Sequence, residues 1–86
     1  MREVVLDGNE MTTKVAMHDY LKNSFKLPYY YGRNLDSLYQ ILNKEMDPVS
    51  IVLKNKDSIA LGYGDALVLL FRDLALKNKN YKFTVM

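Results

Sequence analysis

The sequence predicts one α/β domain in two layers, with a three-stranded parallel sheet and about four helices, most of them on one face. Two observations predict this fold class. Short apolar segments at residues 4–6, 49–53 and 81–86 are separated by long stretches with helical periodicity, and such alternation is typical of parallel sheets with right-handed crossovers. The length of 86 residues suits one modest core, so residues 1–86 are predicted to form a single domain.

The first apolar run ends at Asp7-Gly8-Asn9, a pattern that predicts a buried strand followed by a turn. Thr12 or Thr13 can then serve as the N-cap of a helix that is expected to reach about Lys26 and to stop before the next proline. The apolar stripe of this helix, spaced at i, i+4 and i+8, comprises Met17, Leu21 and Phe25.

The rest of the chain predicts two further helices and two further strands. Asn34 is predicted to cap a helix that Asp47-Pro48 ends. The buried stripe of that helix comprises Leu35, Leu38 and Leu42, with Ile41 as a further candidate. Residues 49–53 are nearly all apolar, as expected for a strand that is covered on both faces or lies at the sheet centre. After a short helical turn, Asp65 is expected to cap a long helix through about Leu76, and the alternating last six residues predict the third strand.

Composition excludes several classes of protein. The chain contains no cysteine, so it can have no disulfide, thiol nucleophile or zinc-thiolate site, and this favours a reducing cytoplasm. The apolar run near the N-terminus is too short for a signal peptide, and no apolar run approaches the roughly 20 residues of a membrane span. The net charge of +2 is too small to indicate nucleic-acid binding by itself. We therefore expect a cytoplasmic protein without a membrane segment.

Residues suited to catalysis are few. His18 is the only histidine, and its place beside the apolar stripe predicts a packed structural side chain. The serines lack the context of a nucleophile elbow, and one histidine without cysteine offers no metal-ligand spacing. Gly62-Tyr63-Gly64 lacks the third glycine of a dinucleotide-binding fingerprint. We expect no enzymatic activity, no cofactor and no metal.

The segment from Leu27 to Asn43 is unusual because three consecutive tyrosines precede an N-capped helix. One face of that helix, opposite its leucine stripe, carries Asp36, Tyr39, Gln40 and Asn43. Tyrosine provides a large contact area at a small cost in rotamer entropy, so it is common in binding surfaces. The alternative is that the tyrosines merely cover the core; for the cluster as a whole, a binding surface is the favoured interpretation.

One stretch of the chain resembles the central motif of the barstar family. It reads Leu27-Pro28-Tyr29-Tyr30-Tyr31-Gly32-Arg33-Asn34-Leu35-Asp36-Ser37-Leu38-Tyr39. That motif reads Leu-Pro, tyrosines, then Gly-x-Asn-Leu-Asp-x-Leu and an aromatic residue. Two further segments resemble parts of the family pattern. One is Asp7-Gly8, which precedes the helix that bears His18, and the other is Phe71-Arg72-Asp73 in the last helix. The resemblance extends over nearly the whole chain and implies a barstar-like fold.

The resemblance also implies a function. Barstar-like proteins bind a cognate ribonuclease, an extracellular-type enzyme, inside the producing cell in a one-to-one complex. The second helix and its preceding loop enter the nuclease active site, where a carboxylate replaces an RNA phosphate. The predicted partner-binding residues are Tyr30, Tyr31, Gly32, Arg33, Asn34, Leu35, Asp36, Tyr39, Gln40, Asn43, Leu70 and Asp73, with Asp36 as the phosphate mimic.

Several positions depart from the family pattern. Tyr39 replaces a tryptophan, Gln40 replaces the principal aspartate, and Arg33 and Lys77 stand where acidic residues are usual. Asp73 keeps an acidic position but can pair with Lys77 at i+4. The acidic surface is therefore diluted, which weakens electrostatic steering toward a basic nuclease. The alternatives are an antitoxin-like protein for a different toxin or enzyme and, less favoured, a small RNA-binding module, whose phosphates Asp36 would repel.

Overall fold

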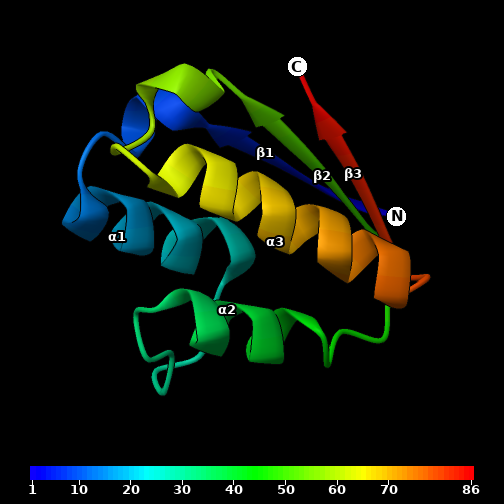
Figure 1. Ribbon diagram of the computed structural model, residues 1–86. Coiled ribbons are helices and arrows are strands. Elements are labelled where there is room, and N and C mark those ends of the chain that lie inside the picture. Colours follow the sequence, from blue (N-terminus) through cyan, green and yellow to red (C-terminus); the bar gives the residue numbers. More distant parts are fainter.

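Three parallel strands form one layer of the computed structural model, which describes residues 1–86, and helices cover one face of the sheet (Figure 1). The strands are β1 Arg2–Asp7, β2 Val49–Lys54 and β3 Tyr81–Val85. The α-helices are α1 Lys14–Phe25, α2 Leu35–Leu42 and α3 Tyr63–Lys77, and two 3-10 turns are η1 Gly8–Glu10 and η2 Lys56–Ser58. The predicted two-layer α/β class with a three-stranded parallel sheet is confirmed, and the three α-helices with two short turns agree with the expected number of about four.

The central strand is β2, which pairs with β1 on one side and with β3 on the other. Its residues Val49, Ile51 and Leu53 face the helices and are almost completely buried, whereas Ser50 and Val52 are only half-buried. The apolar composition of β2 therefore reflects its position at the sheet centre and not coverage of both faces. The opposite face of the sheet is not covered by a helix (Figure 1).

The first helix begins and ends close to its predicted bounds. The Thr13 side chain accepts a hydrogen bond from the backbone N–H of Ala16 at 3.1 Å, which confirms this residue as the N-cap. Lys26 takes a left-handed backbone conformation with φ of 54°, and the N–H of Leu27 then donates to the carbonyl of Lys22 at 2.9 Å. This arrangement ends the helix and turns the chain toward the tyrosine-rich loop.

Two predicted helix boundaries were wrong. The helix α2 ends at Leu42 and not at Asp47-Pro48, because the buried Tyr81 hydroxyl donates to the Leu42 carbonyl at 2.7 Å and satisfies the end of the helix there. Asp65 does not cap α3, because its carboxylate pairs with the Lys56 ammonium at 3.0 Å instead. The N-cap of α3 is Gly62, whose φ of 85° suits glycine.

The turn after β1 explains the Asp7-Gly8 pair. The Asp7 carboxylate accepts hydrogen bonds from the Asn9 backbone N–H and the Asn55 side-chain amide, both at 2.9 Å. A side chain at residue 8 would place its Cβ 1.9 Å from the Asn55 carbonyl oxygen. Only glycine therefore allows the two 3-10 turns to pack against each other at this end of the sheet.

The core lies between the sheet and the helices and consists of 19 buried apolar residues. Phe71 on α3 is fully buried, with its ring centroid 6.1 Å from that of Phe25 on α1 and 5.3 Å from that of Phe83 on β3. This residue thus connects two helices to the sheet. None of the helices has the length and apolarity needed to cross a bilayer.

Candidate partner-binding surface

The N-terminus of α2 is held by a set of reciprocal hydrogen bonds. The Asn34 side-chain oxygen accepts from the Ser37 backbone N–H at 2.8 Å, which confirms the predicted N-cap. The Ser37 hydroxyl in turn accepts from the Gly32 backbone N–H at 2.8 Å, and the Asn34 amide donates to the Gly32 carbonyl at 3.2 Å. The loop and the first turn of the helix therefore form one preorganised unit.

Asp36 is the second residue of α2 and projects from this unit. It is exposed and forms no ion pair within the protein. A negatively charged side chain in the first turn of a helix interacts favourably with the helix dipole. The expected exposure of Asp36 in the free protein is confirmed, and its charge is available to a partner.

The three consecutive tyrosines occupy different environments. Tyr29 and Tyr30 are 92% and 62% exposed, and their rings pack edge to face with centroids 5.6 Å apart. Tyr31 is only 6% exposed, and burial raises the pKa of its hydroxyl to about 12. The structure thus places Tyr31 in the core beneath the loop. Its prediction as an exposed contact residue was therefore wrong. Tyr29, absent from the predicted set, is the more accessible ring.

His18 joins Tyr31 to α1. Its Nδ1 lies 2.6 Å from the Tyr31 hydroxyl, the side chain is 2% exposed, and its Nε2 is buried without a hydrogen-bond partner. This confirms that the single histidine is a packed structural residue. Desolvation by burial, followed by the positive charges of Arg33 and Lys14, lowers the pKa of His18 below its usual 6.5. The lowered pKa favours the neutral imidazole in the folded protein.

Acidification is expected to destabilise the fold through His18. The unfolded chain takes up a proton near the usual pKa of 6.5, whereas the folded chain resists it. The free energy of unfolding should therefore be highest above about pH 6.5 and fall as the pH decreases from there toward the lowered pKa of the folded state. Urea unfolding followed between about pH 8 and pH 5 measures this slope. A His18→Gln variant should lose the slope in this range, and an identical slope in both proteins would refute the assignment.

The Arg33 side chain connects the loop to α1. Its guanidinium pairs with the Asp19 carboxylate at 2.8 Å and donates to the Val15 carbonyl at 3.4 Å. The residue also has a left-handed backbone conformation, with φ of 54°. These contacts hold the loop in one position relative to the helix, so Arg33 has a positioning role in the free protein.

Tyr39, Asp73 and Lys77 meet where α2 packs against α3. The Lys77 ammonium lies 3.1 Å from the Asp73 carboxylate, which confirms the pair expected at i, i+4. The neighbouring Tyr39 hydroxyl and then Lys77 hold the pKa of Asp73 below its usual value. Leu70 lies one turn before Asp73 and is partly buried against the core.

The loop, the outer face of α2 and the adjoining face of α3 form one continuous region, here called the α2 surface. Its exposed members are Tyr29, Tyr30, Gly32, Arg33, Asn34, Asp36, Gln40 and Asn43. Its half-buried members are Leu35, Tyr39, Leu70 and Asp73. The predicted contact residues other than Tyr31 are therefore brought together on an accessible surface.

A family model described as Barstar (barnase inhibitor) matches residues 1–86, the whole chain. The chain belongs to the barstar family. The resemblance seen in the Leu27–Tyr39 motif is thereby confirmed. Over 56 residues the chain is also 43% identical to a protein of Bacillus subtilis (strain 168) named "Putative ribonuclease inhibitor YrdF". That match covers 64% of this chain and 62% of the relative, which is less than two thirds of the relative's length.

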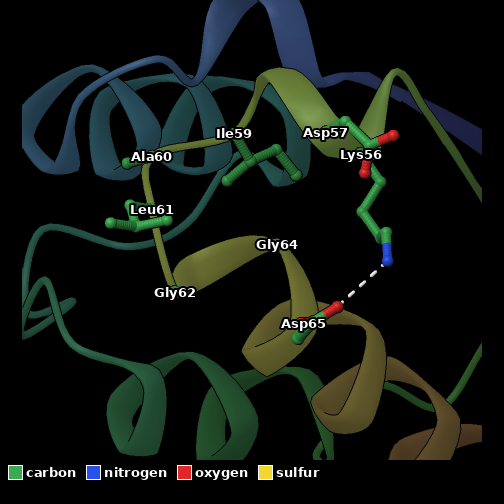
Figure 2. Close-up of a pocket in the computed structure, with 8 residues that line it drawn as sticks. All are labelled: Lys56, Asp57, Ile59, Ala60, Leu61, Gly62, Gly64 and Asp65. Atoms are coloured by element: carbon green, nitrogen blue, oxygen red, sulfur yellow. Dashed lines mark hydrogen bonds and ion pairs between the residues drawn. The ribbon is translucent and has the colours of Figure 1, made fainter.

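A hollow elsewhere in this barstar-family domain lies at the N-terminal end of α3. It is open to solvent, has a volume of about 170 Å³, and is lined by Lys56, Asp57, Ile59, Ala60, Leu61, Gly62, Gly64 and Asp65 (Figure 2). The ion pair between Lys56 and Asp65 spans its edge (Figure 2). None of the predicted partner-binding residues lines it, so it is separate from the α2 surface.

Proposed function

We propose that this protein is a cytoplasmic inhibitor that binds and blocks the active site of a cognate extracellular-type ribonuclease in a one-to-one complex. The loop and α2, residues 28–43, act as the plug, and Asp36 takes the place of an RNA phosphate. The observation that carries the proposal is the unpaired carboxylate of Asp36 on a rigidly capped helix terminus beside exposed tyrosines, in a domain of the barstar family. The name of the Bacillus relative agrees with this role.

The chemistry of the α2 surface suits a nuclease cleft. A ribonuclease must hold phosphates with cationic side chains, and a carboxylate presents two acceptor oxygens to such groups. A charge pair that becomes buried in a complex is favourable only when further hydrogen bonds satisfy its atoms. The exposed Gln40 side chain lies one turn after Asp36 on the same helix face, and its amide can provide such bonds.

The exposed tyrosines supply the apolar part of the contact. Tyr30 is accessible enough to anchor a complex, and Tyr39 on the neighbouring helix is half-buried. Aromatic side chains near the centre of an interface commonly contribute much of the binding free energy. Both tyrosines are held on preorganised backbone, so little ordering is required on binding.

The burial of the single histidine supports a role as an inhibitor without catalytic activity. The one histidine is enclosed and bonded to Tyr31, so it is not presented to a substrate. We therefore propose that the protein carries out no reaction itself and acts by occupying the active site of another protein.

Calorimetric titration and RNA cleavage test the proposal. The protein would be titrated into barnase and into other small secreted ribonucleases, and cleavage of a fluorescent RNA would be followed in each mixture. One-to-one binding with loss of cleavage is expected for at least one of these enzymes. Full cleavage in all mixtures at saturating protein would contradict ribonuclease inhibition, and a salt-dependent shift of labelled RNA by the protein alone would favour the RNA-binding alternative.

A toxin of another enzymatic class is the second candidate target. The observation that favours it is the Asp73–Lys77 pair, because Lys77 neutralises one of the few negative charges of the α2 surface. Co-expression with non-ribonuclease toxins, scored by cell growth, distinguishes this antitoxin-like role from ribonuclease inhibition.

A further inference from the structure

Three carboxylates lie on or beside the α2 surface, but only one of them has no cation next to it. The Asp19 carboxylate is 2.8 Å from the Arg33 guanidinium, and the Asp73 carboxylate is 3.1 Å from the Lys77 ammonium. Asp36 forms no ion pair. Over the members of the α2 surface and their ion-pair partners Asp19 and Lys77, the net charge is therefore that of a single carboxylate.

Both ion pairs lie at the surface, and each has a further contact beside it. Arg33 also donates to the Val15 carbonyl at 3.4 Å. The Tyr39 hydroxyl lies beside Asp73 and strengthens the ionised form of this carboxylate together with Lys77. A partner cation that approached Asp73 would have to displace the Lys77 ammonium or lie close to it, which is unfavourable because like charges repel.

Beyond Asp36, the rest of the exposed face of α2 carries no charged residue as far as Asn43. Gln40 is exposed one turn after Asp36 and presents an amide, which can donate and accept hydrogen bonds but cannot neutralise a cation. A nuclease cation buried against this amide would keep an uncompensated charge, and such burial is strongly unfavourable. A cleft with several free cations is thus a poor match for the α2 surface.

We infer that the α2 surface fits a nuclease cleft with one uncompensated cationic subsite, large enough for a single phosphate, flanked by neutral hydrogen-bonding and apolar groups. This inference rests on the proposed function and specifies the chemistry of the partner. Asp36 occupies the phosphate subsite, Gln40 faces the neutral groups, and Tyr30 packs against the apolar rim. Association proceeds with little electrostatic steering, at rates of about 10⁵–10⁷ M⁻¹s⁻¹.

The inference is tested with barnase as the probe, by measuring association rate and affinity from about 0.02 M to 0.5 M NaCl. The wild type is expected to show a weak salt dependence. Lys77→Gln frees the Asp73 carboxylate, so it should raise the association rate at low salt several-fold and steepen the salt dependence. The matched control is Lys56→Gln, which breaks a similar ion pair with Asp65 at the far end of α3 and should change neither quantity. Circular dichroism verifies that each exposed variant is folded.

Further outcomes also decide the question. If the wild type does not bind barnase but the double variant Gln40→Asp/Lys77→Gln does, the charge of the α2 surface limits partner choice, as inferred. A steep salt dependence in the wild type that Lys77→Gln leaves unchanged would overturn the inference. Failure of both proteins to bind at low salt would also overturn it, since added negative charge would then not be what the complex lacks. The proposed function is judged separately, by the RNA-cleavage assay with the other ribonucleases.

Discussion

Replacement of Asp36 by asparagine is expected to weaken ribonuclease binding by on the order of 10²- to 10³-fold, about 3–4 kcal/mol. Asparagine keeps the shape of the side chain but removes the charge, so a cation of the nuclease would remain buried without a counterion. The free energy of unfolding should change by only about 0.3–1 kcal/mol, because exposed Asp36 contributes to the fold mainly through the dipole of α2. Titration calorimetry gives the affinity, and urea unfolding gives the stability.

A matched variant distinguishes a local from a general charge effect. Asp57→Asn removes an equally exposed carboxylate from η2, in the hollow at the N-terminal end of α3 and outside the α2 surface. Its affinity should equal that of the wild type. Equal affinity for Asp36→Asn as well would remove Asp36 from the contact residues and with it the phosphate-mimic role.

Replacement of Phe71 by alanine is expected to reduce the free energy of unfolding by about 3–5 kcal/mol. Phe71 is fully buried and its ring packs against those of Phe25 and Phe83, so its removal leaves a cavity between both helices and the sheet. A domain of this size has a total stability of only about 5–15 kcal/mol, and the variant should therefore unfold at a much lower urea concentration.

The comparison for this variant is Tyr29→Ala, because that ring is 92% exposed. Its loss should alter stability by no more than about 0.5 kcal/mol. A loss below about 1 kcal/mol for Phe71→Ala would show that the helices repack around the missing ring and that Phe71 does not hold the layers together. Folded Phe71→Ala should bind the nuclease as the wild type does, since Phe71 lies outside the α2 surface.

The fold was largely predictable because its signals are local. The stripe Met17, Leu21 and Phe25 is buried as expected, and Thr13 and Asn34 cap the helices to which the sequence assigned them. Caps and stripes depend on residues within a few positions of one another, so the sequence alone reveals them. The Asp65 cap failed for the opposite reason. Its carboxylate is used by Lys56, nine residues earlier, and no rule of local spacing anticipates that pair.

The candidate surface was predictable in outline but not in detail. The Gly32–Leu38 motif indicated the family, and the faces of the next helix separated leucines from polar residues. The environments of Tyr29, Tyr30 and Tyr31 could not be distinguished, because adjacent identical residues in a loop have no periodicity. Tyr31 is the buried one because its hydroxyl meets His18 of α1.

The sequence by itself therefore determined the order of strands and helices, the caps of α1 and α2, most of the buried stripes and membership of the barstar family. Only the tertiary structure decided which tyrosine is buried and which carboxylate remains free. The physical reason is that both depend on contacts between segments distant in the chain. Arg33 reaches back to Asp19, Tyr39 lies beside Asp73, and Tyr31 meets His18 only after α1, α2 and α3 have packed together.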